Sequence, residues 1–409
     1  MPKYNIVLVI VDSWNRNFVG CFNEGARIEN LTPNLDAFSK ECVTFTSAYS
    51  AGVRTAVSAL AILSGCCPCR YGDWYKSVSP KRTMLSQILQ KNGYSTYGFT
   101  ANPCTSSWRK FEKGFNVFRD DGILFKNMHG PLLEALLLLK TLLRDPYSSG
   151  EELNFQIRQN FKKDKLPYFV SLHYMDIHGP YISRSGWQFK NRMEAGSVWK
   201  KATISPEKIN PSEKEKMLAV YKEKMKYLDS QIGELLNEND DSRSMIIITG
   251  DHGDLFGTRG YYGHPDIFCN EMINVPLFIK FPQDLEIKSQ ICSYPVSLMD
   301  LVPTVLDVLD IQVNYDFDGN SLMPLMYNRE SDYKTKFIIS EQSRNYACAI
   351  NGEWKMIANY GESIFELYNW KEDYGEKINL INEKVEIRDR LEAFIRNHIE
   401  KNRPVTYQK

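Results

Sequence analysis

The sequence has no excess charge of either sign and no long uninterrupted apolar run. Lysine plus arginine and aspartate plus glutamate each total 50 among 409 residues, so the formal net charge is zero. Because binding to nucleic acid or to an anionic membrane usually requires a basic excess or patch, the composition favours neither partner. The best apolar candidate, residues 132–143, is interrupted by Glu134 and Lys140 and is shorter than the ~20 residues of a membrane helix. We therefore expect no membrane span.

The sequence also leaves no room for a secretory leader, because the first predicted strand begins at residue 5. The cysteines number nine, an odd count, and without export we expect them to stay reduced. The group Cys66, Cys67 and Cys69 is too tightly spaced for the usual paired metal ligands, and we interpret it as a packing feature. With 43% hydrophobic and 24% charged residues, the chain is typical of a globular enzyme, which we expect to be cytoplasmic.

The order of apolar segments predicts an α/β fold. Short apolar runs alternate with helical patterns such as 83–92 and 212–237, an order typical of a mostly parallel sheet flanked by helices on both faces. We expect residues 1–319 to form this domain, with an insertion at about 119–165. The insertion contains an amphipathic helix near 132–143, which belongs either to the core or to a lid or partner surface. The predicted strands of the sheet are 5–11, 43–48, 94–100, 168–173, 245–249 and 275–281.

After residue 319 the pattern changes to short strands joined by tight turns. Residues 336–340, 347–350 and 353–358 are predicted strands, and Asn351-Gly352 between the last two is typical of a two-residue hairpin turn. A helix near 383–400 closes the chain. Residues 320–409 are therefore predicted to form a smaller C-terminal antiparallel α+β subdomain packed on the first domain.

Two of the predicted buried strands end in polar residues. Asp12 directly follows the first strand, and Asp251 and His252 belong to the segment Thr-Gly-Asp-His-Gly at 249–253. Ligands of open α/β sheets collect outside the carboxyl ends of the strands. A single aspartate there is often only a helix cap, but two acids with an adjacent histidine indicate a metal site. Carboxylate and imidazole ligands favour zinc or manganese, with calcium as a third option.

Thr55 is the candidate nucleophile. It follows a turn of small residues at 50–54 and opens a helical pattern with apolar residues at 57, 60 and 63. The N-terminus of a helix offers free N–H groups and the positive end of the helix dipole, which favour an alkoxide and hold an anion. The simpler alternative is a threonine that only caps its helix.

Taken together, these segments resemble the sulfatase family of the alkaline phosphatase superfamily. The similarity covers nearly the whole chain, in order, and implies the alkaline phosphatase/sulfatase fold and a metal-dependent hydrolase acting on ester bonds. The segments that carry it are Asp12, 31–36, 43–49, 52–58, the Asp-x-His-x-Pro turn within 168–181, Gly-Asp-His-Gly at 250–253 through His264, 275–277, 297–304 and 365–369.

Three positions depart from the sulfatase pattern. Thr55 replaces the cysteine or serine that sulfatases convert to formylglycine, and threonine lacks the primary side-chain carbon that this oxidation requires. Ala59 replaces an arginine that supports that group. Residues 52–58 instead resemble the Gly-x-x-Thr-Ala-x-Ser of phosphoethanolamine and phosphoglycerol transferases and some phosphodiesterases. Ser13 stands where many sulfatases have a second aspartate, which makes a calcium site less secure and zinc or manganese more plausible.

The resemblance assigns roles to the candidate residues. His178 and His264 match histidines near the leaving group, where they can donate a proton, and Arg54 is the nearest cation to the nucleophile in sequence. Whether the site holds one ion or two stays open. The implied metal ligands are Asp12, Thr55, Asp251 and His252, and the residues available to a second ion are His178, His264, Asp176 and Asp254.

We therefore expect a hydrolase that cleaves a phosphate diester, phosphonate or sulfate ester through a covalent intermediate on Thr55. Its substrate would be a small molecule or an ester of a glycan or lipid. One alternative is a transferase of the phosphoethanolamine or phosphoglycerol type, which passes a phosphoryl-linked headgroup to a hydroxyl acceptor. The other is a noncatalytic, sulfatase-like binding protein. Transfer to an acceptor distinguishes the first alternative, and failure to bind any divalent metal would indicate the second.

Overall fold

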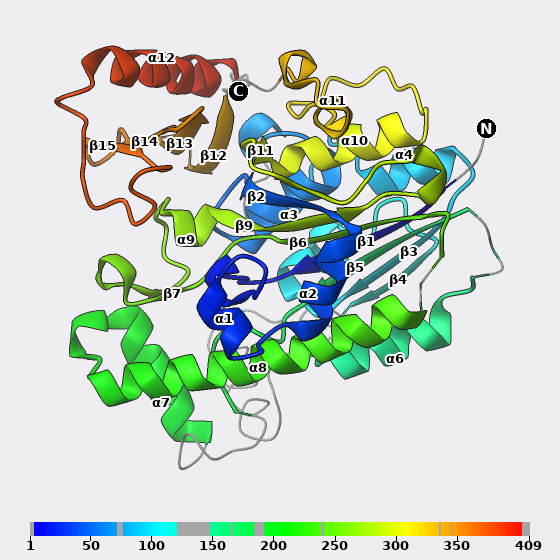
Figure 1. Cartoon of the computed structure of the whole chain (residues 1–409), viewed down its shortest axis with the longest axis horizontal. Coiled ribbons are helices and arrows are strands. Elements are labelled where there is room, and N and C mark those ends of the chain that lie inside the picture. Colours follow the sequence, from blue (N-terminus) through cyan, green and yellow to red (C-terminus); the bar gives the residue numbers. More distant parts are fainter. Residues whose placement is uncertain are drawn as a thin grey trace, which may run out of the picture.

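The computed structural model describes residues 4–71, 77–120, 148–163, 165, 167–183, 192–238, 241–334, 337–343 and 345–402. Its main body is a large sheet between two layers of helices, and a smaller sheet with its own helix lies at one end (Figure 1). Most of the predicted insertion, including the amphipathic helix near 132–143, lies outside the described residues, so that prediction is untested.

The large sheet has the strand order β10-β2-β9-β6-β1-β5-β3-β4, and β11 pairs with β2. Every neighbouring pair is parallel except those of β9, which runs antiparallel to β2 and β6. The mostly parallel sheet flanked by helices is thus confirmed. The strands are β1 (Asn5–Val11), β2 (Val43–Tyr49), β3 (Ser95–Thr100), β4 (Val117–Asp120), β5 (Tyr168–Tyr174), β6 (Ser244–Gly250), β9 (Asn274–Lys280), β10 (Gln290–Cys292) and β11 (Val296–Ser297).

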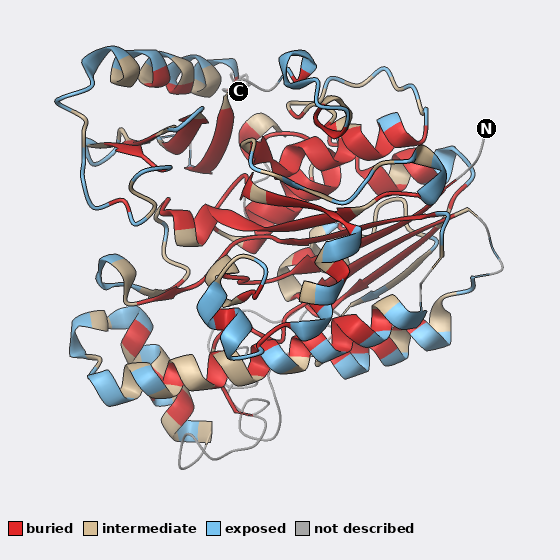
Figure 2. Ribbon diagram, in the orientation of Figure 1, coloured by how far each residue is buried: buried red, intermediate tan, exposed pale blue. Residues whose placement is uncertain are grey.

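The central strands are buried on both faces, which explains their continuous apolar sequences. All seven residues of β1 are buried, as are all seven of β6 (Figure 2). Alternate residues of β1 contribute to two different cores, Ile6, Leu8 and Ile10 to one and Val7, Val9 and Val11 to the other. Strand direction leaves no mark in such runs, and the sequence therefore did not distinguish antiparallel β9 from its parallel neighbours.

Helices cover both faces of the sheet. One core contains residues of α3 (Thr55–Ser64), α4 (Leu85–Lys91) and α10 (Leu301–Val308). The opposite core contains residues of α2 (Pro33–Phe38), α6 (Gly150–Asn160) and the long α8 (Pro211–Glu238). The shorter or outlying elements are α1 (Glu24–Ile28), α7 (Arg192–Ile204), α9 (Asn270–Ile273), α11 (Met323–Met326), β7 (Leu255–Phe256) and β8 (Tyr262–Gly263).

The smaller sheet is antiparallel, as predicted, with its strands in sequence order. It consists of β12 (Ile338–Ser343), β13 (Tyr346–Asn351), β14 (Trp354–Asn359) and β15 (Ile364–Asn369), and α12 (Val385–Lys401) packs on it. The sequence analysis did not predict β15, an edge strand whose first three residues are not buried.

The two sheets share core residues. Ala51 and Ala61, from the large domain, belong to the same buried cluster as Ile339 of β12 and Leu391 of α12. Residues 322–333 include side chains buried in the core of the large domain, and the first strand of the small sheet begins at Ile338. The domain boundary at 319/320 stays a prediction.

The helices and the cysteines bear on two predictions made from the sequence. No helix in the described ranges is long and apolar enough to cross a membrane. The nine cysteines are all free thiols.

The buried centre of the sheet should dominate the stability of the large domain. We expect Ile247→Ala in β6, where the side chain is 1% exposed, to lower the free energy of unfolding by about 2–5 kcal/mol, because a cavity forms in a rigid core. Ile291→Ala in β10 is the matched control, since Ile291 is 76% exposed, and it should change stability by less than about 0.5 kcal/mol. Urea unfolding followed by fluorescence measures both, and equal losses would contradict this account of the core.

Candidate active site

Strand register brings the sequence-predicted acids to one edge of the sheet. Val11 at the end of β1 lies opposite Gly250 of β6 and Tyr174 of β5. The backbone ladder continues one residue further, because the N–H of Asp12 donates to the carbonyl of Tyr174 at 3.0 Å and the N–H of Asp251 donates to the carbonyl of Val11 at 3.1 Å. Asp12 and Asp251 therefore emerge side by side, and both are 0% exposed.

Thr55 is the first residue of α3 and lies against Asp12. Its hydroxyl donates to Oδ2 of Asp12 at 2.8 Å and lies 3.3 Å from Nε2 of His252. The helix begins after Arg54, whose extended backbone gives no side-chain cap. Thr55 itself is 7% exposed. Its hydroxyl therefore points into the cluster of acids at the N-terminus of a buried helix.

Asp251 and His252 are held by their own backbone surroundings. Oδ1 of Asp251 accepts from the N–H of His252 at 2.7 Å and from the N–H of Ser13 at 3.3 Å. Nδ1 of His252 is 2.9 Å from the carbonyl oxygen of Gly253, which fits an Nδ1–H donor and leaves Nε2 with a free lone pair. A Cβ on Gly253 would come within 1.9 Å of the carbonyl oxygen of Glu271, so only glycine fits this turn.

Two further polar residues reach the same cluster, and the sequence analysis did not select them. Asn102 lies two residues beyond the end of β3, and its side-chain amide donates to Oδ2 of Asp12 and, at 3.4 Å, to the hydroxyl of Thr55. His173, in β5, has Nε2 at 3.6 Å from Oδ2 of Asp251, and its Nδ1 is 3.1 Å from the hydroxyl of Thr105. Both residues lie near the carboxyl ends of predicted strands, and this position was the signal that could have found them.

The cluster has the composition and the unsatisfied groups of a cation site. Asp12, Asp251 and His252 each offer a ligand atom, all within 4.8 Å of one another. Oδ2 of Asp251 and Nε2 of His173 are buried, with no hydrogen-bond partner among the described residues. Because uncompensated buried polar atoms are costly, these atoms fit a divalent ion that has carboxylate and imidazole ligands. Thr55 lies beside this cluster, and its role as a fourth ligand stays a prediction.

Ser13 and the charges around Asp12 complete this cluster. The Ser13 hydroxyl donates to Oδ1 of Asp12 at 2.8 Å, so it occupies space next to the predicted ligands as a donor rather than as a carboxylate. Burial opposes the charge on Asp12, but nearby histidines, His178 first, hold the pKa of its carboxyl well below the ordinary value. Asp12 is therefore an ionised carboxylate in this environment.

His178 and His264 lie together at the mouth of the cluster, with ring centroids 4.9 Å apart. Burial lowers the pKa of His178, although Asp12, with an oxygen 3.9 Å from its Nε2, acts in the opposite direction. Burial also disfavours the charged form of His264, but the hydrogen bond from its Nδ1 to Asp254 at 3.0 Å and the charge of Asp254 outweigh it and raise the pKa. The two imidazoles thus differ in proton affinity.

Two of the residues considered for a second ion have other contacts. Asp254 holds His264 through one oxygen and accepts from the hydroxyl of Tyr181 through the other. Asp176 accepts from the N–H of Gly150 at 2.9 Å, at the start of α6. Within the described residues, the metal-like groupings do not include Asp176 or Asp254.

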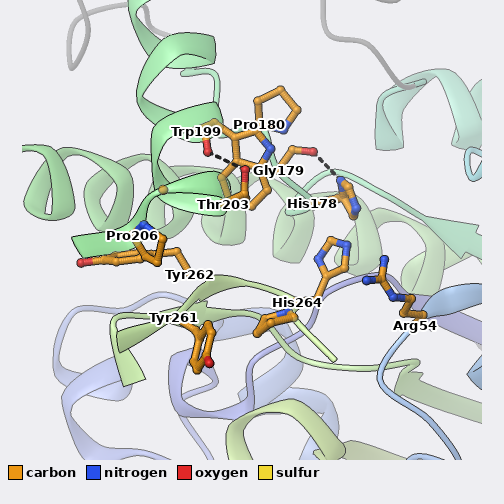
Figure 3. A pocket seen from close by; sticks show the side chains of 12 residues that line it. Arg54, His178, Gly179, Pro180, Trp199, Thr203, Pro206, Tyr261, Tyr262 and His264 are labelled. Atoms are coloured by element: carbon orange, nitrogen blue, oxygen red, sulfur yellow. Dashed lines mark hydrogen bonds between the residues drawn. The ribbon is translucent and has the colours of Figure 1, made fainter. Parts of the chain in front are cut away.

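A pocket of about 370 Å³ opens beside the two histidines. Arg54 and His178 lie at one end of it, and Pro206 and Tyr262 lie at the other (Figure 3). Arg54 is partly exposed and pairs with Asp266 at 2.6 Å. The remaining lining residues are Gly179, Pro180, Trp199, Ala202, Thr203, Tyr261, His264 and Pro265.

Two known protein families match this chain. Residues 4–311 match the sulfatase family, and residues 257–403 match the C-terminal region of N-sulphoglucosamine sulphohydrolase. The two matches together cover both sheets and α12.

Individual proteins are similar to this chain in sequence or fold over nearly its whole length. Arylsulfatase K of Mus musculus is 23% identical, covering 96% of this chain and 79% of its own. Phosphonate monoester hydrolase of Silicibacter pomeroyi has the same fold, with a TM-score of 0.75 and 17% identity, covering 99% of this chain and 97% of its own. A structure solved in complex with its substrate D-glucosamine-2-N,6-O-disulfate has a TM-score of 0.72 and 16% identity over the full length of both chains.

The buried acids should make a measurable cation site. After treatment with a chelator, we expect Mn²⁺ to bind the wild-type protein, and Asp251→Asn to weaken this binding by at least about tenfold because a ligand charge is lost. Asp332→Asn, at an exposed position, is the control and should bind as the wild type does. Isothermal titration calorimetry measures all three, and equal affinities would place the Mn²⁺ site elsewhere.

Proposed function

The chain belongs to the sulfatase family, and from this premise we propose that it is a metal-dependent hydrolase that uses Thr55 as its nucleophile. The family relationship supports a hydrolase acting on sulfuric or phosphoric esters. One observation carries the assignment of Thr55, namely the position of its hydroxyl 2.8 Å from Asp12 and 3.3 Å from His252 at the start of α3. We propose zinc or manganese, with calcium as the other option, held by Asp12, Asp251, His252 and the Thr55 oxygen, with His173 within reach.

Such an ion, when bound, stabilises negative charge and lowers the pKa of a hydroxyl that contacts it. The chain's own residues prepare the nucleophile. Oδ2 of Asp12 accepts a hydrogen bond from the hydroxyl of Thr55 and so orients it, and the side-chain amide of Asn102 donates to the same carboxylate oxygen. The N-terminus of α3 provides free N–H groups for the nonbridging oxygens of the ester. Arg54, directly before the helix, faces the pocket with its own positive charge.

The leaving group requires a proton, and His264 is the better placed donor. Its raised pKa makes it more readily protonated than His178, whose pKa is lowered, and Asp254 fixes the ring through Nδ1, which directs Nε2 away from that carboxylate. The Thr55 hydroxyl must lose its proton in order to attack, and the lowered pKa that a bound ion would give it allows solvent to take this proton. As the Thr55 oxygen then bonds to phosphorus or sulfur, the bond to the leaving oxygen breaks and that oxygen takes the proton of the His264 imidazolium. Water attacks the covalent ester, the bond to the Thr55 oxygen breaks, and Thr55 regains a proton from solvent. His178, with its lowered pKa, is suited to accept a proton from that water.

The side chain of Thr55 also bears on the choice between phosphorus and sulfur. Threonine cannot become formylglycine, and an ester on its oxygen must therefore be released by attack on phosphorus or sulfur itself. We favour phosphate diesters and phosphonates as substrates over sulfate esters for this reason. The substrate would be a small molecule or a glycan or lipid ester seated in the pocket beside His178 and His264, where Trp199 and Tyr261 offer aromatic surfaces. The cytoplasmic location stays a prediction from the sequence.

Turnover by Thr55 variants tests the proposal. We expect metal-reloaded wild-type protein to hydrolyse an aryl phosphate diester or phosphonate monoester, and Thr55→Ala to lose at least about a thousandfold in kcat because the covalent step is removed. Thr55→Ser should retain activity. Thr46→Ala, at a half-buried threonine of β2, is the control. Product release is followed by absorbance. Mass spectrometry of the intact protein should give the mass of the unmodified sequence, because Thr55 needs no conversion to act as a nucleophile.

The same assay separates the alternatives. Cleavage of an aryl sulfate alone would reverse the preference for phosphorus. Product that appears only when a sugar or glycerol hydroxyl is supplied would indicate a transferase. Full activity in Thr55→Ala would overturn the covalent mechanism, and a protein that neither turns over nor binds a divalent ion would be a noncatalytic member of the family.

A second experiment tests the proton donor. We expect His264→Gln to slow hydrolysis of esters with poor leaving groups by about 10²–10⁴-fold and to affect 4-nitrophenyl esters much less, because a good leaving group needs no proton. Asp332→Asn, at an exposed position outside this pocket, serves as the control and should leave the rates with all esters unchanged. Rates across a series of leaving groups give the slope for each variant, and an unchanged slope in His264→Gln would assign the donor to another residue.

A further inference from the structure

A second cluster of ligand-type side chains lies outside the pocket, where three segments of the chain meet. Cys67 and Cys69 follow α3, and Cys69 lies in a short 3₁₀ helix (Pro68–Tyr71). Glu341 comes from β12, and His398 comes from the last turns of α12, which lies over the small sheet (Figure 1). Residues far apart in the sequence thus contribute thiol, carboxylate and imidazole groups to one place.

The ligand atoms of this cluster lie close enough together to bind one ion. Cys67, Glu341 and His398 each offer a ligand atom, all within 4.8 Å of one another. Donors 2.0–2.3 Å from a tetrahedral ion lie roughly 3.3–3.8 Å apart, so a small contraction suffices. Oε2 of Glu341 already lies 3.4 Å from Nε2 of His398.

The carboxylate of Glu341 is the strongest indication of a missing cation. Glu341 is 1% exposed, and Cys67 beside it is also 1% exposed. The thiol of Cys69 donates to Oε2 of Glu341, while Oε1 has no hydrogen-bond partner in the described part of the chain. A buried carboxylate oxygen without a partner is costly. A divalent ion would satisfy this oxygen and would also compensate the charge of a Cys67 thiolate.

We propose that Cys67, Glu341 and His398 form a zinc-type metal site, separate from the cluster around Asp12, which fastens α12 to the segment that follows α3. Thiolate, imidazole and carboxylate are the three donor types that zinc accepts in proteins. The spacing of the cysteines along the chain did not indicate this site, because two of its three ligands come from the C-terminal part. A cavity of about 420 Å³, lined by Cys67 and His398, leaves room for water as the fourth ligand.

The position of the site suggests a structural role, because one of its residues contacts the turn that precedes Thr55. The backbone N–H of Glu341 donates to the carbonyl of Ala51 at 2.8 Å, and the carbonyl of Glu341 would lie 3.0 Å from a Cβ on Gly52. Ala51 and Gly52 belong to the turn that precedes Thr55. An ion bound by Glu341 therefore holds β12 against the turn that positions the start of α3, as well as against α12.

Cobalt provides a probe that reports thiolate ligation alone. We expect chelator-treated wild-type protein to bind Co²⁺ with a thiolate-to-metal charge-transfer band in the near ultraviolet, which Asp, His and Thr ligands do not produce. Cys67→Ser should abolish the band. Cys66→Ser is the matched control, because the Cys66 thiol is directed to Tyr315 at 3.7 Å. Cys104→Ser is the second control, since Cys104 lies near the acids of the other site.

His398→Gln provides a test on another element, should Cys67→Ser fail to fold. We expect this variant to bind Co²⁺ at least about tenfold more weakly, as measured by titration of the thiolate band. With the site around Asp12 kept filled by excess Mn²⁺, it should also lose the further increase in Tm that Zn²⁺ gives the wild type. Hydrolysis measured with Mn²⁺ in the other site is recorded alongside, so failure of the proposed function leaves this test readable. A folded wild type without the band, or a band unchanged in both Cys67→Ser and His398→Gln, would overturn the proposal.

Discussion

The burial of Asp12 and Asp251 side by side is the constraint on which the rest of the site depends. Both carboxylates are fully removed from solvent, at the ends of the two strands that form the middle of the sheet. Two like charges in such a place repel each other and lose their hydration, so they persist only with compensating groups around them. Several polar residues nearby contribute to that compensation, among them the Ser13 hydroxyl and the imidazoles of His173 and His178.

This compensation is directional. Each carboxylate uses part of its hydrogen-bonding capacity within the chain, Asp12 with Ser13 and Thr55, and Asp251 with the backbone of His252. Oδ2 of Asp251 has no hydrogen-bond partner among the described residues. The chain thus fixes the carboxylates by hydrogen bonds on one side and leaves ligand atoms open on the other. Such an arrangement is preorganised for the cation that we propose, and it holds the hydroxyl of Thr55 at its edge.

The sequence alone predicted the large sheet and the antiparallel C-terminal sheet. It also predicted the residues of the buried acid cluster that directly follow apolar strands. Asp12 and Asp251 were accessible to it because a polar residue directly after an apolar strand is a local signal. His173 and Asn102 were not selected, because one lies inside a strand and the other two residues beyond one, and their convergence is a property of register. The edge strand β15 and the antiparallel direction of β9 were not predicted either, because local periodicity encodes neither.

The C-terminal unit has a closer relation to the site than the order of the domains along the chain suggests. Its first strand, β12, binds the turn before Thr55 through the backbone of Glu341, and the hydroxyl of Ser340 donates to the carbonyl of Ser50 in the same turn. Because these contacts fix where α3 begins, a displacement of β12 would move the hydroxyl of Thr55 relative to Asp12. The small sheet therefore helps to position Thr55, the proposed nucleophile, although none of its described side chains lies among those around the buried acids.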